Sequence, residues 1–143
     1  MNTALVCRTL SAAASLTLIF CLTGRAETTP FHRAPLEAAQ LVNPYASQPQ
    51  AIQVGRELYQ QHCAVCHGSN AAGSGTIPAL AHGPVQTAPA GAVFWFITKG
   101  SVSGAMPSWA SLPEQQRWQL VSYLQSLHDA PTSSDDKRAM HSP

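Results

Sequence analysis

Apolar residues recur at helical spacing in two stretches of this chain of 143 residues. In residues 51–62 the apolar and small side chains share one broad face at intervals of three and four, as in an amphipathic helix: Ile52, Val54, Gly55, Leu58 and Tyr59. Residues 113–127 repeat the pattern more strongly, with Trp118, Leu120, Val121, Tyr123, Leu124 and Leu127. Pro113 suits a first helical position, and Glu114 complements the helix dipole in the first turn. We therefore predict a helix in each stretch.

A third stretch, residues 90–99, is a dense apolar run that ends at Gly100. A glycine in that place is typical of a helix C-cap. Its β-branched and aromatic side chains, however, also favour a buried strand, so the pattern alone allows either element. Between the three stretches, Gly, Pro, Ser and Ala dominate, which indicates loops.

The N-terminus has the layout of a secretory signal peptide. Arg8 precedes the uncharged run of residues 9–23, and Gly24-Arg25-Ala26 offers small residues around a cleavage point. The uncharged run falls short of the roughly 20 residues that span a membrane, so an uncleaved anchor is the less favoured alternative. Cleavage as a lipoprotein before Cys21 ranks lower, because it would place Phe20 where a small residue is needed. We predict a signal peptide over residues 1–26 and a periplasmic protein.

Two polar segments flank the predicted folded part. Residues 27–50 contain four prolines and few large apolar side chains, so we expect an extended leader or linker. Residues 129–143 are polar, and we expect a disordered tail. The folded domain is then predicted to span residues 51–128.

Charge excludes some classes of partner. The whole chain carries 8 Lys and Arg against 7 Asp and Glu, and cleavage after Ala26 would remove Arg8 and Arg25 and leave a net charge of about −1. No basic stripe for nucleic acid is present. No charged face is strong enough to identify a docking partner.

The strongest chemical signal is C-x-x-C-H at Cys63, Cys66 and His67. Cys7 and Cys21 lie in the predicted signal peptide, so these two thiols would be the only ones left, and such a close pair is no disulfide framework. Two thiols one helical turn apart can each add to a vinyl group on one porphyrin edge, with the histidine aimed at the iron. A thioredoxin-like pair lacks the βαβ context, and a zinc site lacks further ligands at suitable spacing. We expect one covalent haem c.

The size of the domain supports a large cofactor independently of the motif. Three short helices with few large side chains could barely bury enough apolar surface to offset the ordering of the backbone. A haem in the middle would supply the missing core.

A haem carrier needs a second axial ligand, and His/Met ligation raises the potential. Only Met106 and Met140 lie beyond the predicted signal peptide, and Met140 is in the polar tail. Pro107 biases Met106 towards an extended backbone, which suits a side chain that reaches a metal from a loop. His82 is the main rival, because it lies in the loop beyond the motif. We predict iron ligation by His67 and Met106.

These residues resemble the class I c-type cytochromes, over residues 51–127. In that family a glycine on the first helix lets an aromatic residue of the last helix cross closely, and Gly55, Tyr59, Leu120 and Tyr123 match that pattern. Pro78-Ala79-Leu80 resembles the family segment in which a proline carbonyl accepts a hydrogen bond from the proximal histidine and a leucine covers the haem. The resemblance implies a small all-α fold of three main helices around one haem, and it favours a helix over residues 90–99.

The resemblance implies an electron carrier, not an enzyme. An iron held on both sides has no open position for substrate, so it cycles between two oxidation states. Partners would be a periplasmic dehydrogenase and a terminal oxidase or other acceptor, with a membrane only if the N-terminal segment is uncleaved. Alternatives are a haem subunit docked to a dehydrogenase through a tether at residues 27–50, and an open-site haem enzyme or gas sensor. Some members of the family carry a ring of lysines around the haem edge. This domain lacks that ring, because Lys99 is its only lysine. Trp95 and Trp109 have two alternative roles: donating an indole N–H to a haem propionate, or simple apolar packing.

Overall fold

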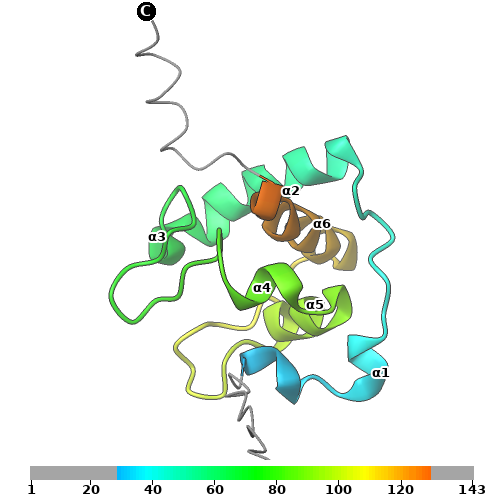
Figure 1. The fold of residues 1–143 in the computed structure, drawn as a ribbon, viewed down its shortest axis with the longest axis horizontal. Coiled ribbons are helices and arrows are strands. Elements are labelled where there is room, and N and C mark those ends of the chain that lie inside the picture. Colours follow the sequence, from blue (N-terminus) through cyan, green and yellow to red (C-terminus); the bar gives the residue numbers. More distant parts are fainter. Residues whose placement is uncertain (1–28, 130–143) are drawn as a thin grey trace, which may run out of the picture.

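The computed structural model describes residues 29–129, and no β-strand lies within that range, so the predicted all-α class is confirmed. The predicted signal peptide and nearly all of the predicted tail lie outside the described residues. No helix within 29–129 is long and apolar enough to cross a membrane. The elements, drawn in Figure 1, are η1 (Pro30–Arg33), α1 (Leu36–Ala39), α2 (Pro49–His62), α3 (Ala64–His67), α4 (Pro84–Thr87), α5 (Ala90–Lys99), α6 (Glu114–Ser126) and η2 (Leu127–Asp129).

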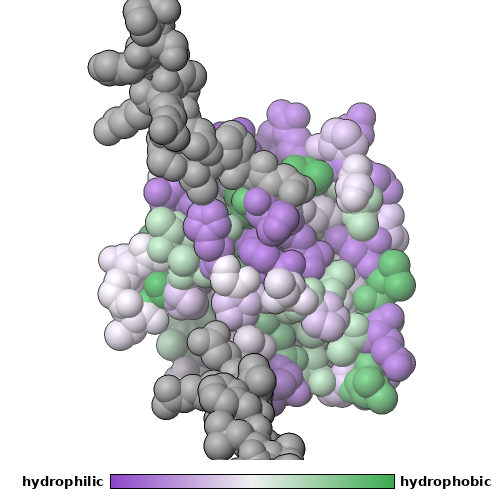
Figure 2. Space-filling model, viewed as in Figure 1, coloured by the Kyte–Doolittle hydropathy of each residue, from purple (hydrophilic) through white to green (hydrophobic). Residues whose placement is uncertain are grey.

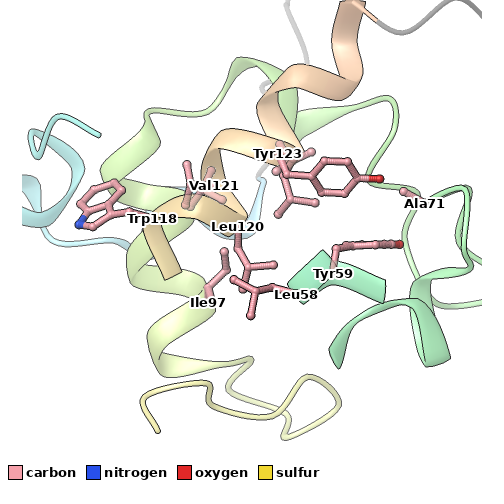
Figure 3. Packing of buried hydrophobic residues seen from close by; sticks show 11 residues of the cluster. Leu58, Tyr59, Ala71, Ile97, Trp118, Leu120, Val121 and Tyr123 are labelled. Atoms are coloured by element: carbon pink, nitrogen blue, oxygen red, sulfur yellow. The ribbon is translucent and has the colours of Figure 1, made fainter. Parts of the chain in front are cut away.

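Helices α2 and α6 form the main contact of the fold, as Figure 1 shows. Their backbones approach at Gly55, where an added Cβ atom would lie 2.0 Å from the backbone oxygen of Gln119 and 2.8 Å from Cβ of Tyr123. Only glycine fits this crossing. The close approach brings Tyr59, four residues further along α2, beside Tyr123, and their ring centroids are 5.3 Å apart. Figure 3 shows these two rings at one end of the core.

Helix α5 completes the core from the other side of α6. The ring of Phe94 stacks on Trp118 with centroids 4.0 Å apart and an interplanar angle of 15°. The Arg117 guanidinium lies 4.8 Å from the centroid of the same Phe94 ring. Val93 and Ile97, four residues apart, are both buried, as expected for one face of a helix. Of the two elements that the sequence allowed for residues 90–99, the structure has the helix. This helix ends at Gly100, which has φ of +74°.

The helix boundaries agree with the sequence patterns to within two residues. The helix predicted over 51–62 begins at Pro49. The helix predicted over 113–127 spans Glu114–Ser126, with Pro113 as its N-cap instead of its first residue. Helix α3 and helix α4 are single turns, too short for hydrophobic periodicity to reveal.

The segment before α2 differs from the extended leader expected from its composition. Phe31 packs edge-on against Phe96 of α5, with centroids 5.6 Å apart. Asn43 is 5% exposed, and its Nδ2 donates to Ser122 Oγ at 2.9 Å. Gly91, without a Cβ, lets the Ala38 carbonyl oxygen of α1 approach α5. Single aromatic, amide and backbone contacts hold this segment, and such contacts leave no apolar period in the sequence.

The crossing at Gly55 predicts a large loss of stability in Gly55→Ala. Alanine gains about 1 kcal/mol in helix propensity, but a methyl group forced against a backbone carbonyl costs about 3 kcal/mol or more. We expect a net loss of about 2 kcal/mol or more in the free energy of unfolding of the haem-loaded protein, measured by guanidinium titration with circular dichroism. Val54→Ala, at a 37% exposed position of the same helix, is the control and should lose less than about 1 kcal/mol. A Gly55→Ala protein as stable as this control would contradict the crossing.

Candidate haem site

The C-x-x-C-H motif forms a single helical turn directly after α2. Cys63 caps α2, and its carbonyl oxygen accepts hydrogen bonds from the backbone N–H of Cys66 at 3.1 Å and of His67 at 2.9 Å. Gly68, with φ of +81°, ends the turn. Both thiols are free and are carried on one turn, as attachment to a single porphyrin edge requires.

The two thiols differ in their surroundings. Cys63 is partly buried and packs against the core, whereas Cys66 is exposed. Burial, with the nearby Cys66 second, raises the pKa of the Cys63 thiol to about 11. A redox-active C-x-x-C pair works with a lowered thiol pKa, so Cys63 lacks that property. Within residues 29–129 no group of three or more His, Cys, Asp or Glu is arranged to hold a metal ion.

The imidazole of His67 is oriented by the loop that follows it. Nδ1 lies 3.0 Å from the carbonyl oxygen of Pro78. A carbonyl oxygen can only accept, so the proton is on Nδ1 and Nε2 keeps its lone pair for a metal. The loop is held by its own backbone: Gly73 N–H donates to the His67 carbonyl at 2.9 Å, and Leu80 N–H donates to the Ala71 carbonyl at 2.8 Å.

Met106 lies in a second loop, between α5 and α6. Its N–H donates to Ser101 Oγ at 2.9 Å, and its carbonyl accepts from Ser101 N–H at 3.0 Å. Gly100 permits this turn, since an added Cβ would lie 2.6 Å from the Met106 oxygen. The Met106 side chain is half-buried against the core, as is Leu80 from the first loop. Both loops thus present apolar side chains at the rim of the core.

The remaining candidates lie in different settings. His82 is exposed. Trp95 is half-buried on α5. Trp109, just after Met106, meets the ring of His62 with centroids 5.2 Å apart. This His62–Trp109 contact joins the end of α2 to the methionine loop, and the sequence offered no sign of it.

Tyr59 is a member of the site that the sequence assigned only to helix crossing. Its ring is fully buried, and its hydroxyl donates to the Gly68 carbonyl oxygen, just after the motif, at 2.7 Å. Burial, followed by the nearby Cys63 and Tyr123, raises the pKa of Tyr59 to about 12. Its place four residues before Cys63 was visible in the sequence, but its hydrogen bond depends on how the following loop folds back.

The residues present fit a haem. A turn with two free thiols, an imidazole whose Nδ1 is already bonded and a half-buried thioether form a donor set of the type that c-type haem uses. Leu80, Met106 and Cys63 are partly buried against the core, so each has apolar surface left that a large apolar group could cover. A hollow of about 420 Å³ between η1, α1, α4 and the start of α5 is lined by none of these residues.

Comparison with known proteins identifies the type of domain. Residues 50–124 match the family described as cytochrome C oxidase, cbb3-type, subunit III. Cytochrome c550 of Pseudomonas aeruginosa is 37% identical over 92 residues, which cover 59% of this chain and 61% of that protein. Quinohemoprotein alcohol dehydrogenase ADH IIB of Pseudomonas putida is 38% identical over 63 residues, 44% of this chain and 9% of that protein. The chain therefore spans less than two thirds of the length of either relative.

The raised pKa of Tyr59 predicts a loss of stability at alkaline pH. Between the ordinary tyrosine value of about 10 and about 12, the unfolded chain releases a proton that the folded protein keeps. Stability is therefore present in full below pH 10 and falls as pH rises through this window. We expect the free energy of unfolding of Tyr59→Phe to fall less over the same range than that of the wild type, in guanidinium titrations at a series of pH values. Parallel curves for the two proteins above pH 10 would contradict this assignment.

Proposed function

The chain belongs to the c-type cytochrome family described as cytochrome C oxidase, cbb3-type, subunit III, and we propose that it is a mono-haem carrier with iron ligated by His67 and Met106. Membership confirms an electron-transfer haem protein of the class I type. Beyond that, we propose the two iron ligands, the covalent attachment of one haem through Cys63 and Cys66, and a periplasmic location. The observation that carries the assignment of His67 as the proximal ligand is its hydrogen bond from Nδ1 to the Pro78 carbonyl at 3.0 Å.

Each residue of the site has a role in holding the cofactor. When bound, haem supplies a reversible one-electron change between ferric and ferrous iron. Cys63 and Cys66 would attach the haem, and His67 would bind the iron through Nε2 with its ring fixed by Pro78. Leu80 would exclude water from the haem, and Met106 would supply a sulfur ligand from the other loop.

The support for Met106 over His82 is burial and backbone restraint. Met106 is half-buried and closed into its loop by two hydrogen bonds to Ser101, whereas His82 is exposed. A restrained ligand reorganises little between oxidation states, as fast electron transfer requires. If His67 and Met106 both bound the iron, no position would remain for substrate, so the open-site alternative requires that Met106 is not a ligand.

The dehydrogenase relative supports a class of partner. A segment similar to this chain occurs within a quinohemoprotein alcohol dehydrogenase, so we propose a periplasmic dehydrogenase as the electron donor and a terminal oxidase or other acceptor as the recipient. A permanently docked haem subunit is the alternative. That alternative uses residues 27–50 as a tether to the dehydrogenase. It has little support, because Phe31 and Asn43 of that segment pack against α5 and α6.

The surface around the motif supports docking without electrostatic steering. Residues 58–98 and 100–113, which include both haem loops, contain no Asp, Glu, Lys or Arg. Val65, between the two cysteines, and Val102, in the methionine loop, are 86% and 83% exposed. In Figure 2 the loops at the side of α3 are mostly white and pale. A partner should therefore present an uncharged, apolar face, because an unpaired charge would lose its hydration on contact.

Methionine ligation is tested by Met106→Ala. The oxidised wild type should show the weak far-red charge-transfer band from methionine sulfur to ferric iron, and Met106→Ala should lose it while its midpoint potential falls. Met140→Ala is the control and should keep the band. A high-spin wild type without the band would sink the proposal in favour of an open-site protein. A low-spin wild type without the band would transfer the ligand role to His82.

The uncharged face predicts weak salt dependence of electron exchange. With hexacyanoferrate, an anion, we expect the rate constant to change by less than about threefold between roughly 10 mM and 100 mM salt, where the Debye length falls from about 30 Å to about 10 Å. Val102→Lys places a charge on the face and should make the reaction faster at low salt, with a clear salt dependence. A steep salt dependence in the wild type itself would show that charges elsewhere reach this face.

A further inference from the structure

Tyr59 makes two separate kinds of contact. Its ring packs beside Tyr123 with centroids 5.3 Å apart, in the space that the Gly55 crossing creates. Its hydroxyl donates to the Gly68 carbonyl oxygen at 2.7 Å. A phenylalanine ring would serve the first contact as well, so packing does not account for the hydroxyl. In Figure 3 the hydroxyl end of Tyr59 points towards the segment that carries Ala71.

The carbonyl that Tyr59 contacts begins a series of hydrogen bonds through the first loop. Gly68 oxygen also accepts from the N–H of Ala71 at 3.0 Å. The Ala71 carbonyl in turn accepts from Leu80 N–H at 2.8 Å and from Ala81 N–H at 3.0 Å. Ala71 is fully buried and has φ of +58°, a strained conformation for alanine that its surroundings must enforce.

This series ends where the imidazole is held. Pro78, two residues before Leu80, accepts the hydrogen bond from His67 Nδ1 at 3.0 Å. Gly73 lies between the two ends, and an added Cβ there would lie 2.4 Å from the Ile77 oxygen and 2.7 Å from the Pro78 carbonyl carbon. The loop is thus packed tightly upon itself, and a shift of Gly68 would be passed on to Pro78.

The geometry points to Tyr59 as a positioning residue that sets the distance between His67 Nδ1 and the Pro78 carbonyl. The inference deepens the proposed function, and it rests on His67 being an iron ligand. With the hydroxyl present, Gly68 is fixed from the buried side by a rigid helix. Without it, the loop relaxes and the His67–Pro78 hydrogen bond lengthens. A weaker hydrogen bond makes the imidazole a poorer electron donor, which favours ferrous iron.

The test compares haem-loaded Tyr59→Phe and Tyr123→Phe with the wild type. In the ferrous protein we expect the His67 Nδ1 proton of Tyr59→Phe to exchange with solvent roughly tenfold faster, the scale of one lost hydrogen bond, and the midpoint potential to rise. Tyr123→Phe removes a hydroxyl from the neighbouring core ring, for which the described residues give no hydrogen-bond partner, and should leave both quantities unchanged. A loss of stability shared by both variants would reflect core packing, so the test is decided by the exchange rate and the midpoint potential.

Equal exchange rates in Tyr59→Phe and the wild type, or equal shifts in both variants, would overturn the inference. Should Tyr59→Phe fail to accumulate with haem, the double variant Tyr45→Phe/Tyr123→Phe, in which Tyr59 is the one remaining tyrosine of the three, is grown with 3-fluorotyrosine for the second measurement. Fluorination makes the hydroxyl a stronger donor, so exchange should slow, and an unchanged rate overturns the inference. Absence of the far-red band in the wild type would defeat the proposed ligation, while the exchange comparison would still report on Tyr59.

Discussion

The fold depends on the contact of two backbones at Gly55. With no Cβ there, α6 lies close enough to α2 for the Gln119 carbonyl to touch it, and the positions of all later residues of α2 relative to α6 follow from that approach. Tyr59 is brought beside Tyr123 one turn later, and Cys63 begins the motif one further turn along. The C-x-x-C-H turn is therefore positioned by a helix crossing eight residues before it. A wider crossing would move the motif at the end of α2 away from the core residues of α6.

Beyond the helices, the site is held by backbone hydrogen bonds and not by ion pairs. The loops that carry Pro78 and Met106 contain no charged side chain, and their carbonyl and N–H groups are bonded within the loops or to Tyr59 and Ser101. Such bonds keep their strength at physiological salt, where exposed ion pairs are screened. They need no charged side chain, so the two loops are restrained while the surface around the motif stays uncharged.

The helices and the motif could be predicted from the sequence because both are local. Helical periodicity and the C-x-x-C-H spacing are fixed within a few turns, whereas the packing of residues 29–50 is not. That segment is held by Phe31 against Phe96, by Asn43 against Ser122 and by the carbonyl of Ala38 against Gly91. Each contact joins residues more than 50 positions apart, and none needs a run of apolar side chains. The hydrogen bond of the Tyr59 hydroxyl could not be predicted either. Its acceptor, the Gly68 carbonyl, is close in sequence but begins a loop whose path depends on the whole domain.

The incomplete core explains why these contacts matter so much. Leu80, Met106 and Cys63 pack against the core and are only partly buried, and a domain of this size has little buried apolar surface to spare. A covalently held haem would fill that side and would be bound in every folded molecule, so the stability of the fold and the redox function would rest on the same group. Under that condition, the hydrogen bonds of Tyr59 and Pro78 serve both purposes, because a loop that closes the core is also the loop that orients the ligand.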